Sequence, residues 1–578
     1  MRFLPLCISV LALTSLARAE NPLFGRVLAK VVCEADETQS YALYVPSNYS
    51  SEQRWPVIFC FDPRAHGLIP VERLRGAAEK YGYILAGSLN SRNGPYPANV
   101  QAAQAMVKDV SAHFSIDPQQ VYTAGMSGGA RVATGIALSG VSKGVIACGA
   151  GFPALEAGVP LRVPFVFFGI VGIEDFNFGE LRRLDDELAE RNATHHIATF
   201  EGGHVWSPEP VLAEAVEWLE LQAMRAGRKP ANPDFIRTTL GNRTAAIQKL
   251  SGLERWRALK AIAADFAGLI DVGEWTREAN ALGASREIKE AVKSEKRLLV
   301  QETELVDDLR QAAAGSEASK QRLVAKLRQR MDTAGNPAER LMLRRAITGY
   351  CSISRETARD LIGKKDYHQA AALLDLAATL RPEEVKLWID LSCAYGLAGD
   401  RKRALESLDR AADAGFDDVA RLEKELAFDR FHSDPRFKEI LAKVGVNRTD
   451  ATVQLPPMKI SSVLATVELR LMYQAKSGSD FPPLSFLSVV SVRPGSAAAK
   501  AGMAPGMEIT SIQGCRIYDL TEGELYNAMA QTARGEIVFT VRDSPRGNER
   551  TMRMPLEKTR PASAVAEGIR DEAMIGDP

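Results

Sequence analysis

The sequence has no excess of charge of either sign. Its 578 residues include 72 lysines and arginines and 72 aspartates and glutamates, so the formal net charge is zero. A protein that binds nucleic acids generally carries a basic excess that matches the phosphate backbone. The charge balance therefore argues against general nucleic-acid binding, and we expect no nucleic acid among the partners of this protein.

Cysteine and histidine are scarce, with seven residues of each. No Cys-x-x-Cys pair occurs, and no group of histidines and cysteines has the spacing of zinc ligands, so we expect no metal and no cofactor. Six cysteines follow the first twenty residues, and an even number permits disulfides in an exported chain. Their wide spacing and apolar surroundings, such as residues 57–61 around Cys60, favour buried free thiols.

Long apolar runs are absent except at the start of the chain. Arg2 precedes a mostly apolar stretch at residues 4–16, and Ala17-Arg18-Ala19 places small residues before a cut at Glu20. This pattern predicts a secretory signal peptide, residues 1–19, that is cleaved after Ala19. A membrane anchor would need roughly 20 apolar residues, which is longer than this run. We therefore expect a periplasmic or secreted protein with no stable membrane span.

Residues 24–227 alternate short apolar runs with helical patterns. The runs 57–61 and 164–168 are entirely apolar, and the run 120–124 is apolar at three of its five positions. Continuous apolar strands separated by helices indicate a parallel sheet that is covered on both faces. The pattern predicts an α/β domain with a doubly wound sheet.

The next part of the chain has no strand patterns. Alanine, leucine and charged residues dominate residues 228–349, which predicts helical hairpins that link domains. Residues 350–445 contain a 34-residue repeat, in which Ala370 and Ala377 recur as Ala404 and Ala411. This repeat resembles tetratricopeptide repeats. Two units and a terminal cap are near the minimum for such a stack, so a spacer and a peptide-binding surface are both open interpretations.

Residues 455–557 change to mainly β patterning. A β-like run at 484–492 is followed by three short motifs: Pro494-Gly495-Ser496-Ala497-Ala498, Ala501-Gly502-Met503 and Ile512-Gln513-Gly514. These motifs resemble a PDZ domain of the bacterial exported type. Met507 and Glu508 replace the usual aspartate-containing step, and Gln513 stands where asparagine is common, but neither departure threatens the fold. The remaining residues, 558–578, have the composition of a disordered tail.

The PDZ resemblance implies binding of protein C-termini by strand addition. In the family, the strand that accepts the peptide comes one strand before the Pro-Gly-Ser turn. In this sequence, residues 467–471 form that strand. Its leading backbone amides would receive the terminal carboxylate, and alternate side chains would shape an apolar pocket. The candidate peptide-binding residues are Val467, Glu468, Leu469 and Leu471. The alternative is a closed module that only packs against its neighbours.

The motif Gly125-Met126-Ser127-Gly128-Gly129 follows a predicted strand and precedes a helical pattern at 130–138. Glycines on both sides allow a sharp turn, which presents the serine oxygen above the sheet at the N-terminus of a helix. This context predicts a nucleophile elbow with Ser127 as the nucleophile. The alternative is a glycine-rich turn in an inactive relative.

A serine hydroxyl is a poor nucleophile without a base. His204 lies in a loop between a predicted strand at 197–200 and the helix that follows, and it is the candidate base. The orienting acid is expected between serine and histidine in chain order. Asp175 is the candidate, with Glu174 as its rival, and the carboxylate would fix the imidazole tautomer and stabilise the imidazolium.

An oxyanion hole requires backbone N–H donors near the nucleophile. Gly128 supplies the first candidate. The second is expected in the loop after residues 57–61, where Pro63 has no N–H, so Asp62 and Arg64 are both candidates and the sequence does not choose between them. Three further side chains are candidates for lining the cleft: His66, Asn90 and Asn93.

Three motifs, at residues 41–49, 125–129 and 201–206, together resemble the α/β-hydrolase superfamily near its polyhydroxybutyrate depolymerase, feruloyl esterase and dienelactone hydrolase branches. The resemblance covers residues 24–225 and implies hydrolysis of an ester or peptide substrate through an acyl-enzyme. It does not name the substrate. We expect an exported serine esterase whose other modules bind proteins. A serine peptidase of the same fold and a binding scaffold with a silent hydrolase-like domain are the alternatives.

Overall fold

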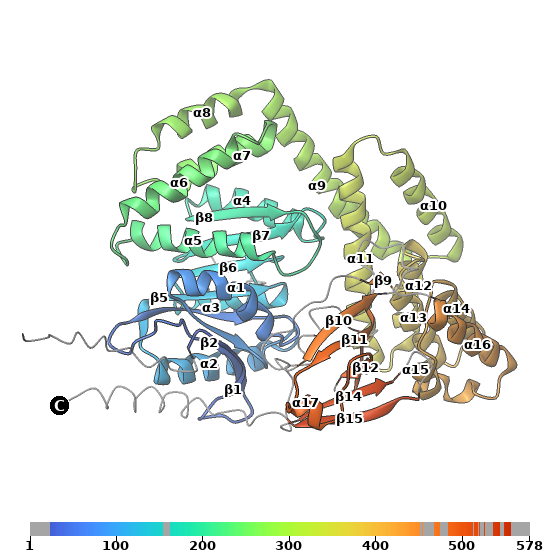
Figure 1. Cartoon of the computed structure of the whole chain (residues 1–578). Helices are drawn as coiled ribbons and strands as arrows, with labels where there is room; N and C mark the ends of the chain where they lie inside the picture. The colour runs from blue at the N-terminus through green and yellow to red at the C-terminus, as the bar shows by residue number, and fades with distance from the viewer. Residues whose placement is uncertain are drawn as a thin grey trace, which may run out of the picture.

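The computed structural model describes residues 24–153, 162–450, 453–454, 467–473 and 484–555, except for 513, 518–519, 521–524, 526–535 and 544–547. The predicted signal peptide and C-terminal tail lie outside these residues. Figure 1 shows an α/β sheet with its helices, a long helical region and a second sheet that is formed by residues late in the sequence, coloured orange to red.

The first sheet has eight strands in the order β1-β2-β4-β3-β5-β6-β7-β8. The strands are β1 (Val27–Val32), β2 (Ser40–Tyr44), β3 (Trp55–Phe61), β4 (Ile84–Ser88), β5 (Ile116–Met126), β6 (Gly144–Cys148), β7 (Val166–Gly172) and β8 (His195–Phe200). Strands β3 to β8 run parallel, whereas β1 and β2 pair antiparallel. The sheet is therefore mixed rather than purely parallel, because the connection from β1 to β2 is too short for a crossover helix.

Helices cover both faces of this sheet, as predicted. Alternate residues of β3 enter two different cores: Val57, Phe59 and Phe61 face one, and Ile58 and Cys60 face the other. The first core also contains residues of α2 (Tyr96–His113), α3 (Gly128–Leu138) and α4 (Phe178–Glu190), and the second contains residues of α1 (Leu68–Tyr81) and α5 (Glu209–Arg225). This two-residue alternation explains why the strands read as continuous apolar runs.

The helical region begins with α6 (Pro233–Ile247), α7 (Gly252–Asp265), α8 (Gly273–Ala284), α9 (Arg286–Ala313), α10 (Glu317–Thr333) and α11 (Pro337–Gly363). It continues with α12 (Tyr367–Leu380), α13 (Val385–Leu397), α14 (Arg401–Asp413), α15 (Val419–Lys424), a 3₁₀ turn (Leu426–Phe431) and α16 (Pro435–Asp450). Polar N-caps begin several helices; Ser285, for example, accepts the Ile288 amide at the start of α9. Helix α11 runs through residue 350, where the patterning predicts a boundary.

The alanines that define the repeat are fully buried where α12 and α14 pack into the helical stack: Ala370, Ala377, Ala404 and Ala411. Small residues at these positions allow neighbouring helices to approach closely. The periodicity in the sequence therefore corresponds to a real packing requirement.

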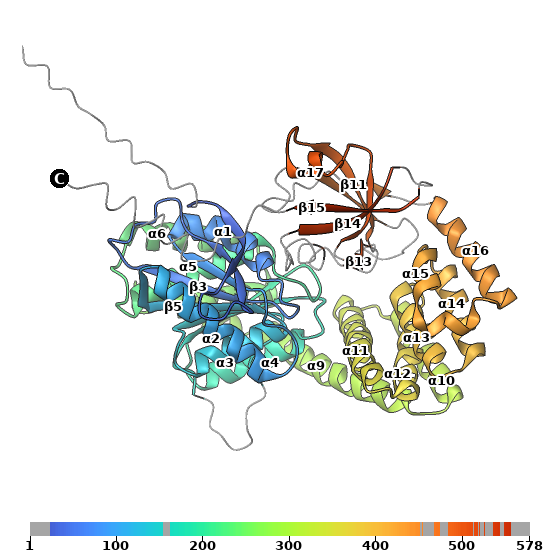
Figure 2. The same ribbon diagram turned by 90° about the horizontal axis from the view of Figure 1, so that it is seen from below.

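The second sheet is antiparallel, with strand order β15-β14-β12-β11-β10-β9 and β13 paired to β12. Strands β11, β14 and β15 of this sheet are labelled in Figure 2. Its elements are β9 (Val453–Gln454), β10 (Val467–Tyr473), β11 (Leu484–Val492), α17 (Ala497–Lys500), β12 (Glu508–Ile512), β13 (Cys515–Arg516), β14 (Glu536–Arg542) and β15 (Arg550–Pro555). Val467, Leu469 and Leu471 of β10 point into the core of this module.

Five cysteines are free thiols in the structure: Cys33, Cys60, Cys148, Cys351 and Cys393. Burial raises the pKa of the Cys148 thiol to about 12, which keeps it protonated and unreactive. Within the described ranges, no helix is long and apolar enough to cross a membrane, and no group of three or more His, Cys, Asp or Glu side chains could hold a metal ion.

Asp265, at the end of α7, joins the helical region to the first sheet. Its buried carboxylate accepts Trp218 Nε1 of α5 at 2.6 Å, and pairs with His196 Nδ1 of β8 at 2.8 Å and with an Arg243 amino group of α6 at 2.6 Å. Helices α6 and α7 are thus anchored to the edge of the sheet, although they follow the predicted domain end at residue 227.

We expect Asp265→Ala to lower the free energy of unfolding of this part by about 3–5 kcal/mol, because it leaves buried cationic and N–H groups without their acceptor. Urea denaturation of the full chain measures this loss. Asp234→Ala is the control: Asp234 pairs with Arg237, both are largely exposed, and such a pair contributes at most about 1 kcal/mol. Equal losses in the two variants would contradict the anchoring role of Asp265.

The same carboxylate gives this anchor a pH dependence. Burial acts to raise the pKa of Asp265, but the charge and hydrogen bond of His196, together with Arg243, outweigh burial and hold the pKa below its usual value. An aspartate whose pKa is lowered by folding stabilises the folded state fully at pH values above its pKa in the unfolded chain, about 3.9. This stabilisation is lost as the pH falls toward the lower pKa of the folded state. The stability difference between wild type and Asp265→Ala should therefore shrink below about pH 4.

Candidate active site

Ser127 occupies a tight turn between β5 and α3. Its backbone has φ 52° and ψ −122°, a conformation that side-chain-bearing residues rarely adopt. The Ser127 amide donates to the Cys148 carbonyl at 2.8 Å, which ties the turn to β6. A Cβ on Gly125 or Gly129 would lie 2.2 Å from a backbone oxygen, so both positions require glycine. These features are those of a nucleophile elbow.

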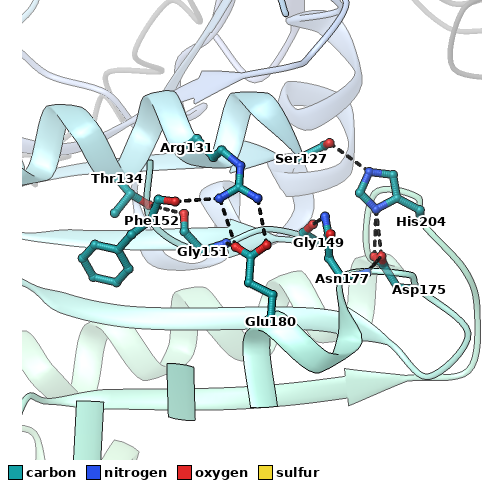
Figure 3. A network of polar contacts seen from close by, with 10 residues as sticks. All are labelled: Ser127, Arg131, Thr134, Gly149, Gly151, Phe152, Asp175, Asn177, Glu180 and His204. Atoms are coloured by element: carbon teal, nitrogen blue, oxygen red, sulfur yellow. Dashed lines mark hydrogen bonds and ion pairs between the residues drawn. The ribbon is translucent and has the colours of Figure 1, made fainter. Parts of the chain in front are cut away.

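The structure brings Ser127, His204 and Asp175 together at the carboxyl ends of parallel strands (Figure 3). His204 Nε2 lies 2.9 Å from Ser127 Oγ, and His204 Nδ1 lies 2.9 and 3.0 Å from the two Asp175 oxygens. Asp175 is 1% exposed. Glu174, the rival acid, instead pairs with Arg344 of α11 at 3.4 Å.

Two neighbours of Asp175 hold Asp175 and His204 in place. The backbone N–H of Asn177 donates to Asp175 Oδ1 at 2.8 Å, and the side-chain Nδ2 of Asn177 donates to the Gly149 carbonyl at 2.6 Å. The Phe176 ring packs on the His204 imidazole with a centroid distance of 4.2 Å. Neither Phe176 nor Asn177 belongs to a recognisable motif, so the sequence alone does not indicate them.

An ion pair links α3, the helix that follows Ser127, to α4, the helix that follows Asp175. Arg131 of α3 binds both carboxylate oxygens of Glu180 of α4, at 3.0 and 2.8 Å. Glu180 also accepts the Gly151 amide at 2.8 Å, and Arg131 donates to the Phe152 carbonyl at 2.6 Å (Figure 3). The pair therefore clamps the segment after β6 and fixes α3 relative to α4.

The loop after β3 contacts both the elbow and the histidine loop. The Arg64 amide donates to Asp62 Oδ1 at 2.8 Å, a bond that would have to break before this amide could bind an oxyanion. Asp62 Oδ2 accepts Trp206 Nε1 at 2.8 Å, two residues beyond His204. Buried His66 lies beside the same carboxylate, with Nδ1 3.6 Å from Oδ1. Asp62 thus braces the histidine loop, a role that the sequence alone does not indicate.

The two asparagines singled out from the sequence have different positions. Asn93 lies against the elbow: a Cβ on Gly128 would meet Asn93 Oδ1 at 1.9 Å. The backbone N–H of Asn93 donates to the Pro63 carbonyl at 2.6 Å. Asn90 instead accepts the Ser40 amide at 2.8 Å and so supports β2 rather than the site.

Comparison with known proteins gives similarity only among solved structures; no family model and no curated protein matches the chain. A fluorophosphonate-binding serine hydrolase of Staphylococcus aureus is 10% identical, with a TM-score of 0.26. The alignment with it covers 31% of this chain and 92% of the hydrolase. A ferulic acid esterase is 15% identical, with a TM-score of 0.27, and the alignment covers 34% of this chain and 97% of the esterase. An esterase of Pyrobaculum calidifontis is 13% identical, with a TM-score of 0.29, and the alignment covers 35% of this chain and 86% of that esterase. Because these identities and scores are low, we draw the function from the geometry of Ser127, His204 and Asp175.

Proposed function

We propose that the protein is an exported serine hydrolase that cleaves carboxylic esters through an acyl-enzyme. The proposal rests above all on the continuous contact from Ser127 Oγ through the His204 imidazole to buried Asp175. His204 Nε2 is in position to accept the serine proton, while Asp175 holds Nδ1–H and stabilises the imidazolium.

The reaction would proceed in two halves. Ser127 Oγ attacks the ester carbonyl carbon as His204 takes the hydroxyl proton, and the tetrahedral intermediate collapses when His204 gives that proton to the leaving alkoxide. The alcohol departs and the acyl group stays on Ser127. Water then attacks the acyl carbon with His204 as base, and the carboxylic acid leaves as the serine proton is restored.

The negative oxygen of each intermediate needs donors that are already in place. We propose the Gly128 amide as one donor, because it is the first residue of α3 and the positive end of the helix dipole lies there. The second donor would come from the loop after β3, from the Asp62 or the Arg64 amide.

A substrate panel tests this function. Purified full-length protein is assayed with p-nitrophenyl esters of increasing acyl length and with peptide p-nitroanilides, beside Ser127→Ala. We expect ester turnover that disappears in the variant and no anilide turnover. Comparable cleavage of anilides would favour the peptidase alternative, and a folded protein without any turnover would favour the silent scaffold.

We further propose that the two C-terminal parts bind proteins. A cavity of about 940 Å³ lies along α10, α12, α13 and α14, and its walls combine aromatic and charged side chains, among them Trp388, Tyr395 and Arg403. This surface favours peptide binding over a simple spacer.

The PDZ-like module has an edge suited to strand addition. Among the described residues, β9 pairs with β10 only at Met472 and Tyr473, so one edge of residues 467–471 has no paired strand. The side chains of Val467, Leu469 and Leu471 are buried in the module core. We therefore propose that backbone hydrogen bonds, including the Glu468 peptide unit, supply most of the affinity for a C-terminus.

A labelled peptide with an apolar last residue and a free C-terminus should bind the full chain at least about tenfold more tightly than its C-terminal amide, because only the carboxylate forms charge-assisted hydrogen bonds with the leading amides. Fluorescence anisotropy measures both affinities. Equal affinities, or no binding of any peptide in a C-terminal library, would support the closed module instead.

A further inference from the structure

Helix α11 of the helical region contacts the loop that carries Asp175. The buried Arg345 side chain binds Glu302 of α9, with Nε and one amino group 3.0 and 2.6 Å from Glu302 Oε2. The other amino group donates to the Ile173 carbonyl at 3.0 Å, two residues before Asp175. The guanidinium also lies 4.5 Å from the centre of the Phe178 ring, just beyond the loop.

This ion pair is poorly explained by stability alone. Desolvation of two buried charges largely offsets their mutual attraction, so a buried pair adds little net stability. A guanidinium, however, presents its N–H groups in a rigid planar fork. With one side of the fork fixed by Glu302, the other side holds the Ile173 carbonyl in one place.

Two further residues on the same face of α11 reach the site. Gly349, one turn after Arg345, packs against Phe176: a Cβ at Gly349 would lie 2.8 Å from Phe176 Cβ, and the Phe176 ring packs on His204. Glu356, two turns further, accepts Asn93 Nδ2 at 3.0 Å, beside Gly128. One helix face therefore contacts Phe176, which packs on His204, and Asn93, which lies beside Gly128.

We infer that α11 is part of the catalytic apparatus, with Arg345 and Gly349 as positioning residues that hold the acid loop, residues 173–177, so that Asp175 and Phe176 orient His204. The inference rests on the proposed hydrolase function and extends it, because it makes the activity of the sheet domain depend on the helical region.

Arg345→Met tests the polar contact in the full-length protein. We expect kcat to fall about 100-fold with KM changed less than about threefold, because a small displacement of a catalytic group can cost two orders of magnitude. The matched control is Arg542→Met, which breaks an Arg–Glu pair with the same side-chain exposures of 6% and 9% in the C-terminal module. This control should keep wild-type kcat. If Arg345→Met does not fold, Arg345→Lys keeps the charge but loses the fork, and it should lower kcat about tenfold.

Gly349→Ala tests the packing contact. Alanine favours a helix over glycine by about 1 kcal/mol, so the change would be neutral or stabilising without the contact to Phe176. We expect kcat to fall at least about tenfold because the added methyl group displaces Phe176. Gly241→Ala is the control, since Gly241 of α6 has nothing within 4 Å of an added Cβ, and it should keep wild-type kcat.

A double-mutant cycle separates positioning from a general structural effect. The rate of fluorophosphonate labelling of Ser127 is measured for Arg345→Met in the wild-type and the Asp175→Asn backgrounds. If Arg345 acts through Asp175, its substitution should slow labelling in the first background and have little effect in the second. The inference would be overturned if Arg345→Met slowed labelling by the same factor in both backgrounds. It would also be overturned if kcat stayed at the wild-type value in three folded variants: Arg345→Met, Arg345→Lys and Gly349→Ala. Failure of the hydrolase proposal is distinguishable, because wild-type protein would then not be labelled at all.

Discussion

Ser127→Ala should reduce ester turnover by a factor of about a million in kcat, and His204→Ala should cause a similar loss, as in a comparable triad. The large effect is expected because the serine oxygen attacks only while the imidazole takes its proton, so neither group works alone. The double variant should add little, because the residues act as one unit.

Single-turnover kinetics with an activated ester measure these losses. Ser139→Ala is a suitable control, because Ser139 caps the other end of α3 and its hydroxyl donates to the Ile136 carbonyl, away from the site. A Ser127→Ala protein with wild-type turnover, or a double variant whose loss is the product of the single losses, would refute the assignment.

Asp175→Asn should leave the fold intact and lower kcat by about 10⁴-fold, the loss seen for this change in a comparable triad. An amide at this position can donate its N–H to His204 Nδ1, which would place the imidazole proton on Nε2. The nitrogen that faces Ser127 Oγ at 2.9 Å would then be a donor and could not accept the serine proton.

The neighbouring carboxylate supplies the control for that experiment. Glu174 is 38% exposed and pairs with Arg344, so Glu174→Gln should change kcat by less than about threefold, since such pairs contribute little energy. Thermal unfolding should be unchanged in both variants. A large loss in Glu174→Gln together with an active Asp175→Asn would make Glu174 the orienting acid.

The positions of Ser127, His204 and Asp175 could be anticipated because each follows a strand that the sequence marks by its apolar run. The carboxyl ends of neighbouring parallel strands meet at one edge of the sheet, so residues 77 positions apart come within hydrogen-bond distance. Strand β1 is harder to predict, because Lys30 interrupts its apolar residues and most of its side chains are only half-buried.

Contacts between distant segments gave no signal in the sequence. Arg345 and the Ile173 carbonyl are 172 positions apart, and the group that Arg345 contacts in the acid loop is a backbone oxygen, which any residue can provide. Gly349 likewise reads as an unfavourable residue inside a helix until Phe176 is seen against it. The sequence therefore indicates Ser127, His204 and Asp175 as candidates, whereas the contacts of α11 near them depend on how the helical region packs.

The central claim, that Ser127 is an activated nucleophile, is tested most directly by fluorophosphonate labelling of the full-length protein and peptide mapping by mass spectrometry. We predict one adduct, on Ser127 within the tryptic peptide 109–131, which also holds Ser111 and Ser115 as internal controls. The adduct should disappear in Ser127→Ala and form more slowly in the presence of an ester substrate. A folded wild-type protein that remains unlabelled, or an adduct on another serine, would contradict the account.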